Sequence, residues 1–208
     1  MDDHEIVLVG RSSSHFTRTA RVFAHDLGVP YIFRAVLDMT AIDPATYGDN
    51  PALKVPVLID QQGPLFGTEN ICRALAVRAG KRDAVVLRGD AAPRLIANAE
   101  ELILHAMNSE VTIIMNAGPG AERPLPPKVR RSLENALDFL EANVEAVRAA
   151  LPPARLVSFC EAALFCLVTH LPFRNIMDVT GYARLQAFCR EFERRPGALA
   201  TPYRFDAA

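Results

Sequence analysis

The strongest constraint on the fold of this chain is a change of pattern near residue 80. Before it, short β-branched runs flank one helical stretch, and a hairpin and a second helix follow. A β-α-β order requires a parallel strand pair. After residue 80 no strand-like alternation is found, and apolar residues recur at helical spacing. We therefore predict an α/β part at residues 1–80, a linker at 81–90 and an all-helical part at 91–208.

Apolar runs and their stop signals predict the individual elements. In the first part we expect strands near 5–10, 30–36 and 55–59, a helix from 15 to 27, a turn at 61–64 and a helix from 68 to about 79. In the second part we expect helices over about 93–116, 127–151, 158–171 and 182–195, with Gly118-Pro119-Gly120 as a linker.

Composition excludes several classes of function. The 23 Lys and Arg residues balance 24 Asp and Glu residues, and neither part is strongly basic, so nucleic acid is not an expected partner. The four cysteines lack CxxC or paired-ligand spacing, which favours reduced thiols in the cytoplasm, and no metal is expected. The N-terminus is acidic where a signal peptide would be basic, and no apolar run approaches the ~18 residues of a membrane span, so we expect neither feature.

Three local motifs carry chemical information. Asn50-Pro51-Ala52-Leu53-Lys54-Val55-Pro56-Val57-Leu58 places a proline in a strand-like run, where it cannot donate a ladder hydrogen bond. Gly67-Thr68-Glu69-Asn70-Ile71-Cys72 opens a helix, whose N-terminal N–H groups and partial positive charge suit a carboxylate. Ser158-Phe159-Cys160-Glu161 has the spacing of a capping box.

Together these motifs resemble the cytosolic glutathione transferases over about residues 5–195. The first matches the family's Asn-Pro…Lys-Val-Pro-Val-Leu signature almost position for position. The second resembles its acidic-Ser/Thr pair, although Asn70 replaces the usual Ser or Thr, and the third resembles its Ser/Thr-x-x-Asp, with Glu161 in place of Asp. The resemblance implies a thioredoxin-like N-terminal domain, and an all-helical C-terminal domain that supplies the acceptor-substrate pocket.

The resemblance also implies a glutathione site. In the family the Val-Pro bond is cis, so Val55, between Lys54 and Pro56, would pair its N–H and C=O with the cysteinyl backbone of glutathione. Glu69 would bind the γ-glutamyl ammonium and Asn70 the γ-glutamyl carboxylate. The alternatives are a trans proline that starts an edge strand and a first-turn acid that complements the helix dipole.

In this family a Tyr, Ser or Cys in the turn after the first strand stabilises the glutathione thiolate. No Tyr or Cys lies between residues 1 and 30, which leaves Ser12, Ser13 and Ser14. Aligning Arg21 with the family's Ser-Pro-x-x-x-Lys-x-Arg pattern selects Ser14. The resemblance to the Arg-Ser-Ser turn of the maleylacetoacetate isomerase class favours Ser12 or Ser13. We rank Ser14 first and Ser12 second; the alternative is that Ser14 only caps the helix.

The resemblance places the acceptor pocket between the serine turn and the first helix of the second part. There His105, Asn108 and Thr112 share one face, and Arg11 and His15 adjoin the turn. A polar pocket would fit a polar or acidic electrophile. Alternatively, the polar stripe meets water, Arg11 is solvated and His15 is an exposed first-turn residue.

The predicted activity is therefore that of a serine-type glutathione transferase, with glutathione as co-substrate and a small electrophile as acceptor. A homodimer is expected by resemblance, and a cytoplasmic location is expected from the cysteine pattern and the acidic N-terminus. Two alternatives remain open at this point. One is a non-catalytic, transferase-like binding or interaction protein, and the other is a glutathione-dependent isomerase or peroxidase.

Overall fold

A computed structural model describes residues 5–90, 93–117 and 125–207. Its main sheet has four strands in the order β2-β1-β3-β4, with β1 parallel to β2 and β3 antiparallel to both of its neighbours. These strands are β1 (Val7–Gly10), β2 (Ile32–Ala35), β3 (Val57–Asp60) and β4 (Gly63–Phe66). The predicted β-α-β unit, hairpin and third strand are all present, so the thioredoxin-like expectation for this part is confirmed.

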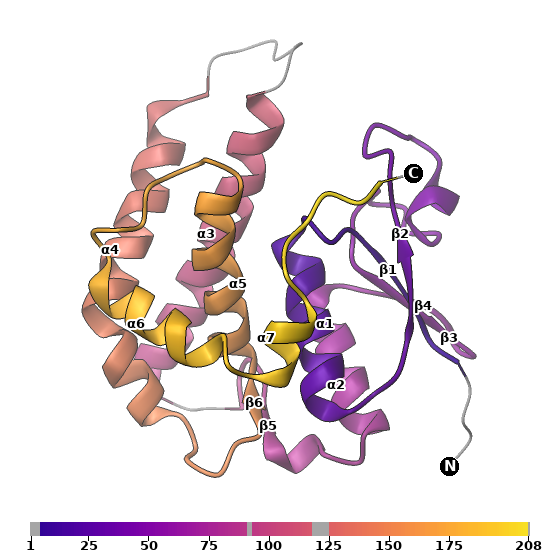
Figure 1. Cartoon of the computed structure of the whole chain (residues 1–208), viewed down its shortest axis with the longest axis horizontal. Helices are drawn as coiled ribbons and strands as arrows, with labels where there is room; N and C mark the ends of the chain where they lie inside the picture. The colour runs from indigo at the N-terminus through magenta and orange to yellow at the C-terminus, as the bar shows by residue number, and fades with distance from the viewer. Residues whose placement is uncertain (1–4, 91–92, 118–124, 208) are drawn as a thin grey trace.

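Strand alternation gives the sheet two different faces. Leu8 and Leu58 point into the large core, on the side covered by α1 (His15–Leu27) and α2 (Thr68–Arg78). Val9 and Val57 lie on the opposite face, in a small cluster with Tyr47 of the 3-10 helix η1 (Pro44–Tyr47). In Figure 1, α1 and α2 lie between the sheet and the helices of the second part.

The second part is helical, as predicted. It contains α3 (Arg94–Asn116), α4 (Pro127–Ala150), α5 (Phe159–Phe173), α6 (Ala183–Phe192) and α7 (Pro196–Ala200). Helix α5 is apolar on all sides and almost wholly buried, which makes it the central helix (Figure 1). The predicted loop at Gly118-Pro119-Gly120 lies outside the described residues.

Several short elements were not predicted. Pro196 was expected to follow the end of the last helix, but it opens α7, where a proline at the first helical position needs no N–H partner. The predicted linker at 81–90 contains the 3-10 helix η2 (Arg82–Ala84) and strand β5 (Val85–Val86), which pairs with β6 (Val157–Ser158). Runs this short carry no readable period.

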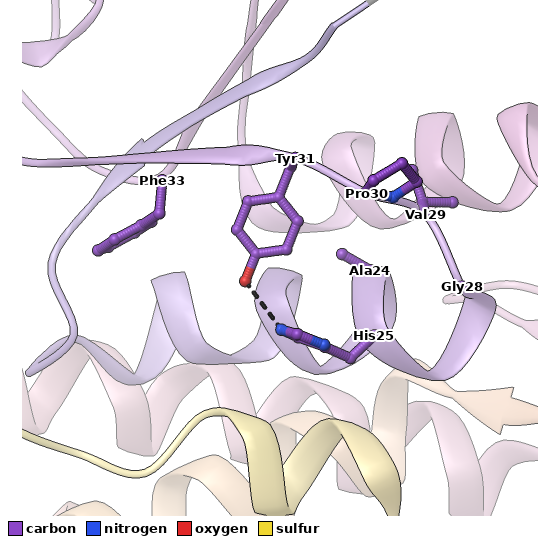
Figure 2. Close-up of a pocket in the computed structure, with 7 residues that line it drawn as sticks. All are labelled: Ala24, His25, Gly28, Val29, Pro30, Tyr31 and Phe33. Atoms are coloured by element: carbon purple, nitrogen blue, oxygen red, sulfur yellow. Dashed lines mark hydrogen bonds between the residues drawn. The ribbon is translucent and has the colours of Figure 1, made fainter. Parts of the chain in front are cut away.

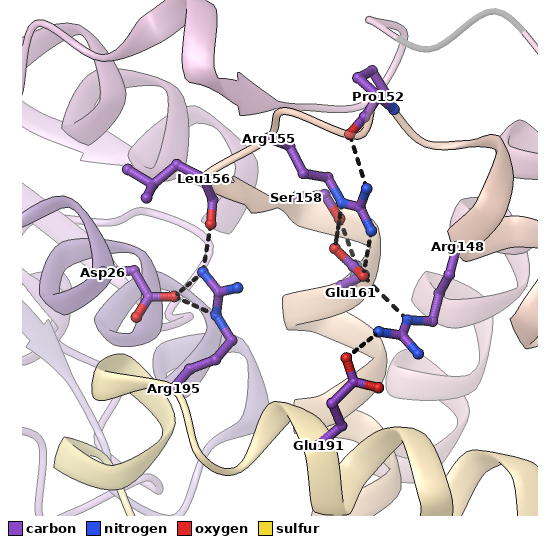
Figure 3. A network of polar contacts seen from close by, with 9 residues as sticks. All are labelled: Asp26, Arg148, Pro152, Arg155, Leu156, Ser158, Glu161, Glu191 and Arg195. Carbon is purple, nitrogen blue, oxygen red and sulfur yellow. Dashed lines mark hydrogen bonds and ion pairs between the residues drawn. The ribbon is translucent and has the colours of Figure 1, made fainter.

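A polar contact ties α7 to α1 (Figure 3). The buried carboxylate of Asp26 accepts a hydrogen bond from Arg195 Nε at 2.8 Å and one from the Gly197 N–H at 2.8 Å. A Cβ at Gly197 would collide with the main chain of Val22, so glycine is required for this close approach. The contact joins the C-terminal end of the chain to the first helix.

The expected cap of α5 is present in altered form (Figure 3). The Glu161 N–H donates to Ser158 Oγ at 3.1 Å, as predicted. However, the Glu161 carboxylate does not reach back to a main-chain N–H. It accepts instead from the Ser158 hydroxyl at 3.0 Å and from two Arg155 nitrogens at 2.8 Å each, and Arg148 contacts it at 3.4 Å. Contacts with two arginines thus replace the second hydrogen bond of the capping box, which would join the Glu161 carboxylate to a main-chain N–H.

Within the described residues, no helix is long and apolar enough to cross a membrane.

Candidate functional site

The serine turn connects the end of β1 to the start of α1. The Arg11 N–H donates to Thr17 Oγ1 at 3.3 Å, and the Ser14 N–H donates to the Arg11 carbonyl at 3.1 Å. A Cβ at Gly10 would collide with the Thr17 side chain, so glycine is required where the strand ends. The turn is therefore fixed from both sides and presents its serines at a helix N-terminus.

The three serines have different environments. Ser14 is the N-cap of α1 and partly exposed, and its Oγ accepts from the Thr17 N–H at 3.2 Å. Ser12 is 2% exposed, and its Oγ accepts from Arg21 Nη1 at 3.2 Å. Ser13 is also buried. Because a hydroxyl has two lone pairs and one proton, Ser14 can cap the helix and still donate its proton to a ligand.

The C-terminal segment covers part of this turn. Asp206 Oδ2 accepts from the Ser12 N–H at 2.8 Å. Tyr203 is held by its hydroxyl, which donates to the Cys166 carbonyl at 2.6 Å, and by stacking on Phe173 at 5.1 Å between ring centroids. The sequence analysis missed this segment because an extended tail has no periodic signal.

The loop before β3 presents a free main-chain edge. The Val55–Pro56 bond is cis, so the expectation of a cis bond is confirmed over the trans alternative. Within the described residues, neither the N–H nor the C=O of Val55 has a hydrogen-bond partner. Asn50 holds the loop, since its Nδ2 donates to the Lys54 carbonyl at 2.8 Å and its Oδ1 accepts from the Ala52 N–H at 3.0 Å.

The start of α2 offers main-chain donors and one acid. The N–H groups of Thr68, Glu69 and Asn70 make no hydrogen bond within the described residues, as is usual in a first turn. Glu69 is partly buried and pairs with Arg73 at 3.3 Å. Asn70 is exposed, and its Nδ2 donates to the Phe66 carbonyl at 3.0 Å. One of the two N–H donors of the Asn70 amide is therefore already bonded to the preceding loop.

His15 is not the exposed residue that one interpretation of the sequence expected. It is 1% exposed, and its Nδ1 lies 2.9 Å from Nδ1 of His170 and 3.4 Å from Glu110 Oε2. His170 Nδ1 lies 2.8 Å from Glu110 Oε1, and its Nε2 donates to the Ser13 carbonyl at 2.7 Å. Residue spacing could not reveal this cluster, because its members come from three different helices.

Burial dominates the charge states in this cluster. It lowers the pKa of His15 well below its usual value, and the neighbouring His170 lowers it further. Burial raises the pKa of Glu110, although the hydrogen bond from His170 opposes this shift. His15 is therefore neutral near pH 7 with a lone pair on one ring nitrogen.

The predicted polar stripe of α3 does not adjoin the serine turn. His105, Asn108 and Thr112 are exposed, whereas Glu110 and Met107, on the other side of the helix, are buried toward α1 and α5. Asn108 and Thr112 bond to carbonyls of their own helix. The exposed arrangement agrees with the alternative interpretation, in which the stripe meets water.

Two arginines adjoin the turn instead. Arg11 has a buried Nε that lacks a hydrogen-bond partner among the described residues. Burial lowers the pKa of Arg174, the charge of Arg11 lowers it further, and the charge of Glu110 opposes the shift. Neither forms an ion pair within the described residues. This side of the turn therefore carries two guanidinium groups, together with the carboxylates of Asp206 and Glu110.

The cysteines are unsuited to thiol chemistry. All four are buried, and burial raises the pKa of each thiol above its ordinary value. They are Cys72, Cys160, Cys166 and Cys189. A serine remains the candidate group at the turn.

Two surface pockets lie away from the turn. One, of about 630 Å³, is lined by the end of α1 and by β2, where the Tyr31 hydroxyl and His25 Nε2 are 3.2 Å apart (Figure 2). The other, of about 600 Å³, lies along β4 and α2 and includes Asn70 and Arg73. Neither includes a serine of the turn.

Comparison with known families finds a similarity in the first part of the chain. Residues 13–78 match the family model of the glutathione S-transferase N-terminal domain. The match covers about a third of the chain, and this segment is similar to a glutathione S-transferase N-terminal domain. It contains Ser13, Ser14, the Val55 loop and the start of α2, whereas Ser12 lies one residue outside the match.

Solved structures extend the likeness to the whole chain. A glutathione S-transferase from Methylobacillus flagellatus KT with glutathione bound has a TM-score of 0.78 at 20% identity, over 95% of this chain and 99% of that one. A glutathione transferase family member from Pseudomonas fluorescens Pf-5 with bound glutathione has a TM-score of 0.79 at 23% identity, over 96% and 100%. The delta-class transferase of Nilaparvata lugens has a TM-score of 0.70 at 20% identity, over 95% and 92%.

The chain therefore has the glutathione transferase fold, in which the segment that matches the N-terminal domain model is followed by the helical part. No curated protein matches the sequence significantly.

Proposed function

We propose that this protein is a serine-type glutathione transferase, which binds glutathione along Val55 and adds its sulfur to a small electrophile. The observation that carries the proposal is the free N–H and C=O of Val55 beside a cis proline, in a transferase N-terminal domain. An extended peptide can pair with such an edge as a further strand would. The glutathione-bound structures that share this fold support the same ligand.

We assign thiolate stabilisation to Ser14. Its Oγ already accepts from the Thr17 N–H, so its proton is free to donate to sulfur, and the N-terminus of α1 adds a favourable dipole. A hydrogen bond to the charged form lowers the pKa of a thiol. Ser12 and Ser13 are buried, and Ser12 is engaged by Arg21, so they are the second and third choices.

The ends of glutathione would meet charged groups of the same domain. Glu69 takes the γ-glutamyl ammonium in exchange for part of its contact with Arg73. The first-turn N–H groups of α2 and the second donor of the Asn70 amide bind the γ-glutamyl carboxylate. Lys54 is exposed beside Val55 and offers a cation to the other carboxylate.

The acceptor is assigned to the chemical class of anionic electrophiles. Arg11 and Arg174 bring two positive charges together beside the turn without an ion-pair partner among the described residues. A carboxylate on the electrophile would relieve their repulsion. His105, Asn108 and Thr112 are left out of this pocket because they are exposed on the far side of α3. A homodimer in the cytoplasm completes the proposal, by likeness to the family.

Isothermal titration with reduced glutathione near neutral pH tests the glutathione site. The wild type is expected to bind in the micromolar to low-millimolar range. Asn50→Ala should weaken binding about tenfold, because it releases the Lys54 carbonyl and loosens the Val55 edge. The matched control, Asn143→Ala, removes an amide whose one hydrogen bond among the described residues goes to the Phe139 carbonyl of its own helix, and should bind as the wild type does.

The outcomes separate the remaining functions. No binding by the folded wild type would refute the glutathione site and leave an interaction module with this fold. Binding without conjugation of any anionic electrophile would refute the transferase assignment. Turnover that returns or oxidises glutathione without consuming it by addition would identify an isomerase or a peroxidase.

A further inference from the structure

Three buried side chains from three helices converge behind the serine turn. They are His15 at the start of α1, Glu110 of α3 and His170 of α5, with exposed fractions of 1%, 0% and 2%. The two Nδ1 atoms are 2.9 Å apart, and Glu110 oxygens lie 2.8 Å from His170 Nδ1 and 3.4 Å from His15 Nδ1. All the potential ligand atoms lie within 4.8 Å of one another.

Protons alone leave this cluster incompletely satisfied. His170 Nε2 must carry a proton, because the Ser13 carbonyl 2.7 Å away can only accept. His170 Nδ1 holds at most one further proton but faces both Glu110 and His15. If that proton points at Glu110, the lone pair of His15 Nδ1 receives no well-aligned donor. In addition, Glu110 Oε2 is buried with only the 3.4 Å contact to His15 Nδ1, and the main-chain contact of His15 with Met107 leaves its Nε2 without a well-formed hydrogen bond, an arrangement that is normally costly.

We propose that His15, Glu110 and His170 bind a divalent transition-metal ion of the zinc type. Two imidazole nitrogens and a carboxylate are a ligand set that zinc accepts. Tetrahedral bonds of about 2.0–2.2 Å place ligand atoms roughly 3.3–3.6 Å apart. The separation of 3.4 Å already fits, and those of 2.8 Å and 2.9 Å need to widen by roughly half an ångström.

The surroundings of His170 have the arrangement of a metal ligand. Its Nε2–H donates to the main-chain carbonyl of Ser13, which fixes the ring so that the Nδ1 lone pair points into the cluster. Such outer contacts of ligating histidines to carbonyls orient the ring and raise its basicity. An ion here would join α1 to α3 and α5, and so connect the transferase domain to the helical part.

One neighbouring charge opposes a cation. The guanidinium of Arg174 acts electrostatically on both His15 and Glu110. It should weaken the binding of a divalent ion without preventing it, because the carboxylate of Glu110 would bind the ion directly. An ion bound by this cluster should therefore bind more tightly when the charge of Arg174 is removed, whereas an ion bound elsewhere should not respond.

Titration of the untagged, full-length protein with Co²⁺ tests the proposal, with Zn²⁺ as a competitor. We expect one equivalent of Co²⁺ to give the visible absorption of a site of low coordination number, and Zn²⁺ to displace it and to raise the unfolding temperature. Glu110→Gln keeps the shape of the side chain and should weaken Co²⁺ binding by at least about tenfold. The matched control, His25→Gln, removes an exposed histidine of the same helix and should leave binding unchanged.

Arg174→Gln provides a second variant, and it should tighten Co²⁺ binding because a positive charge is removed. Circular dichroism establishes that each variant is folded. The proposal is overturned if the wild type gives no such absorption and Zn²⁺ leaves its unfolding temperature unchanged. It is also overturned if folded Glu110→Gln binds as tightly as the wild type, or if Arg174→Gln fails to tighten binding. All these readouts are independent of glutathione.

Discussion

Glu100 is a buried acid of α3 whose charge is poorly compensated. It is 5% exposed, and one carboxyl oxygen has no hydrogen-bond partner among the described residues. Burial raises its pKa to about 7; the charge of Arg88 opposes the shift, whereas Glu69 and Asp90 add to it. The folded protein therefore holds a proton that the unfolded chain releases above its ordinary pKa of 4.5.

This linkage makes Glu100 a source of instability at high pH. Because the folded state binds the extra proton, the contribution of Glu100 to the free energy of unfolding falls as pH rises from about 4.5 to 7. Glu100→Gln should therefore leave the free energy of unfolding nearly unchanged at pH 5 and raise it at pH 8. The expected gain is on the order of 1–3 kcal/mol, because a shift of one pKa unit corresponds to about 1.36 kcal/mol. Urea unfolding at the two pH values measures the difference.

The neighbouring acid supplies the control. Glu101 is 73% exposed in its side chain and pairs with Arg88 at the surface, so Glu101→Gln should change stability by less than about 0.5 kcal/mol at either pH. An equal effect of Glu100→Gln at pH 5 and pH 8 would show that Glu100 is ionised in the folded state.

At the level of single residues, the sequence predicted contacts between near neighbours but not contacts between distant positions. The cis bond before Pro56 and the cap by Ser158 were predictable, because each depends on neighbours within a few positions. The burial of His15 was not, because it depends on Glu110 and His170, which are 95 and 155 positions away. A site assembled from distant helices leaves no spacing to read.

At the scale of elements, the start of α5 is a concentrated source of stability. Ser158 Oγ is buried and both accepts from the Glu161 N–H and donates to the Glu161 carboxylate. Burial raises the pKa of Glu161, but hydrogen bonds from Arg155, Ser158 and Arg148 outweigh it and lower the pKa overall. The stability from this carboxylate is therefore present above its ordinary pKa and is lost as pH falls through the lowered value.

Ser158→Ala should therefore cost about 1–2 kcal/mol of unfolding free energy, since it removes a helix cap and one partner of a buried carboxylate. Chemical denaturation at pH 7 measures the loss. Ser132→Ala is the matched control: its hydroxyl bonds only to the Val129 carbonyl of its own helix, and less than about 0.5 kcal/mol should be lost. Equal losses in the two variants would show that the cap stabilises the protein no more than an ordinary hydroxyl within a helix does.

Long elements were predictable and short ones were not. Helices α1 and α3 were predicted within one or two residues, because their apolar period and stop residues agree. Strands β5 and β6 have two residues each, and α7 has five. Their formation depends on partners elsewhere in the chain: β5 and β6 on each other, and α7 on Asp26 of α1.

At the scale of the whole molecule, the order of elements was enough to predict the fold. A β-α-β unit, a hairpin and a helix can close into a single four-stranded sheet, and the helical remainder packs on its covered face (Figure 1). The path of the C-terminal tail was not predictable. Tyr203 and Asp206 settle on α5 and the serine turn through contacts with residues far away in the sequence.

The central claim is that Ser14 donates a hydrogen bond to the thiolate of glutathione bound along Val55. The most direct test follows the ultraviolet absorbance of the bound thiolate as pH is raised, in the wild type, Ser14→Ala and Ser14→Thr. The wild type should ionise the thiol well below the free value of about 8.5. Ser14→Thr should do the same, because it keeps both the cap and the hydroxyl.

Ser14→Ala should raise the apparent pKa of the bound thiol by about 1–2 units, as expected for the loss of one hydrogen bond to a charged group. The same apparent pKa in the wild type and in Ser14→Ala, with glutathione bound to both, would contradict the account and leave Ser14 as a helix cap alone.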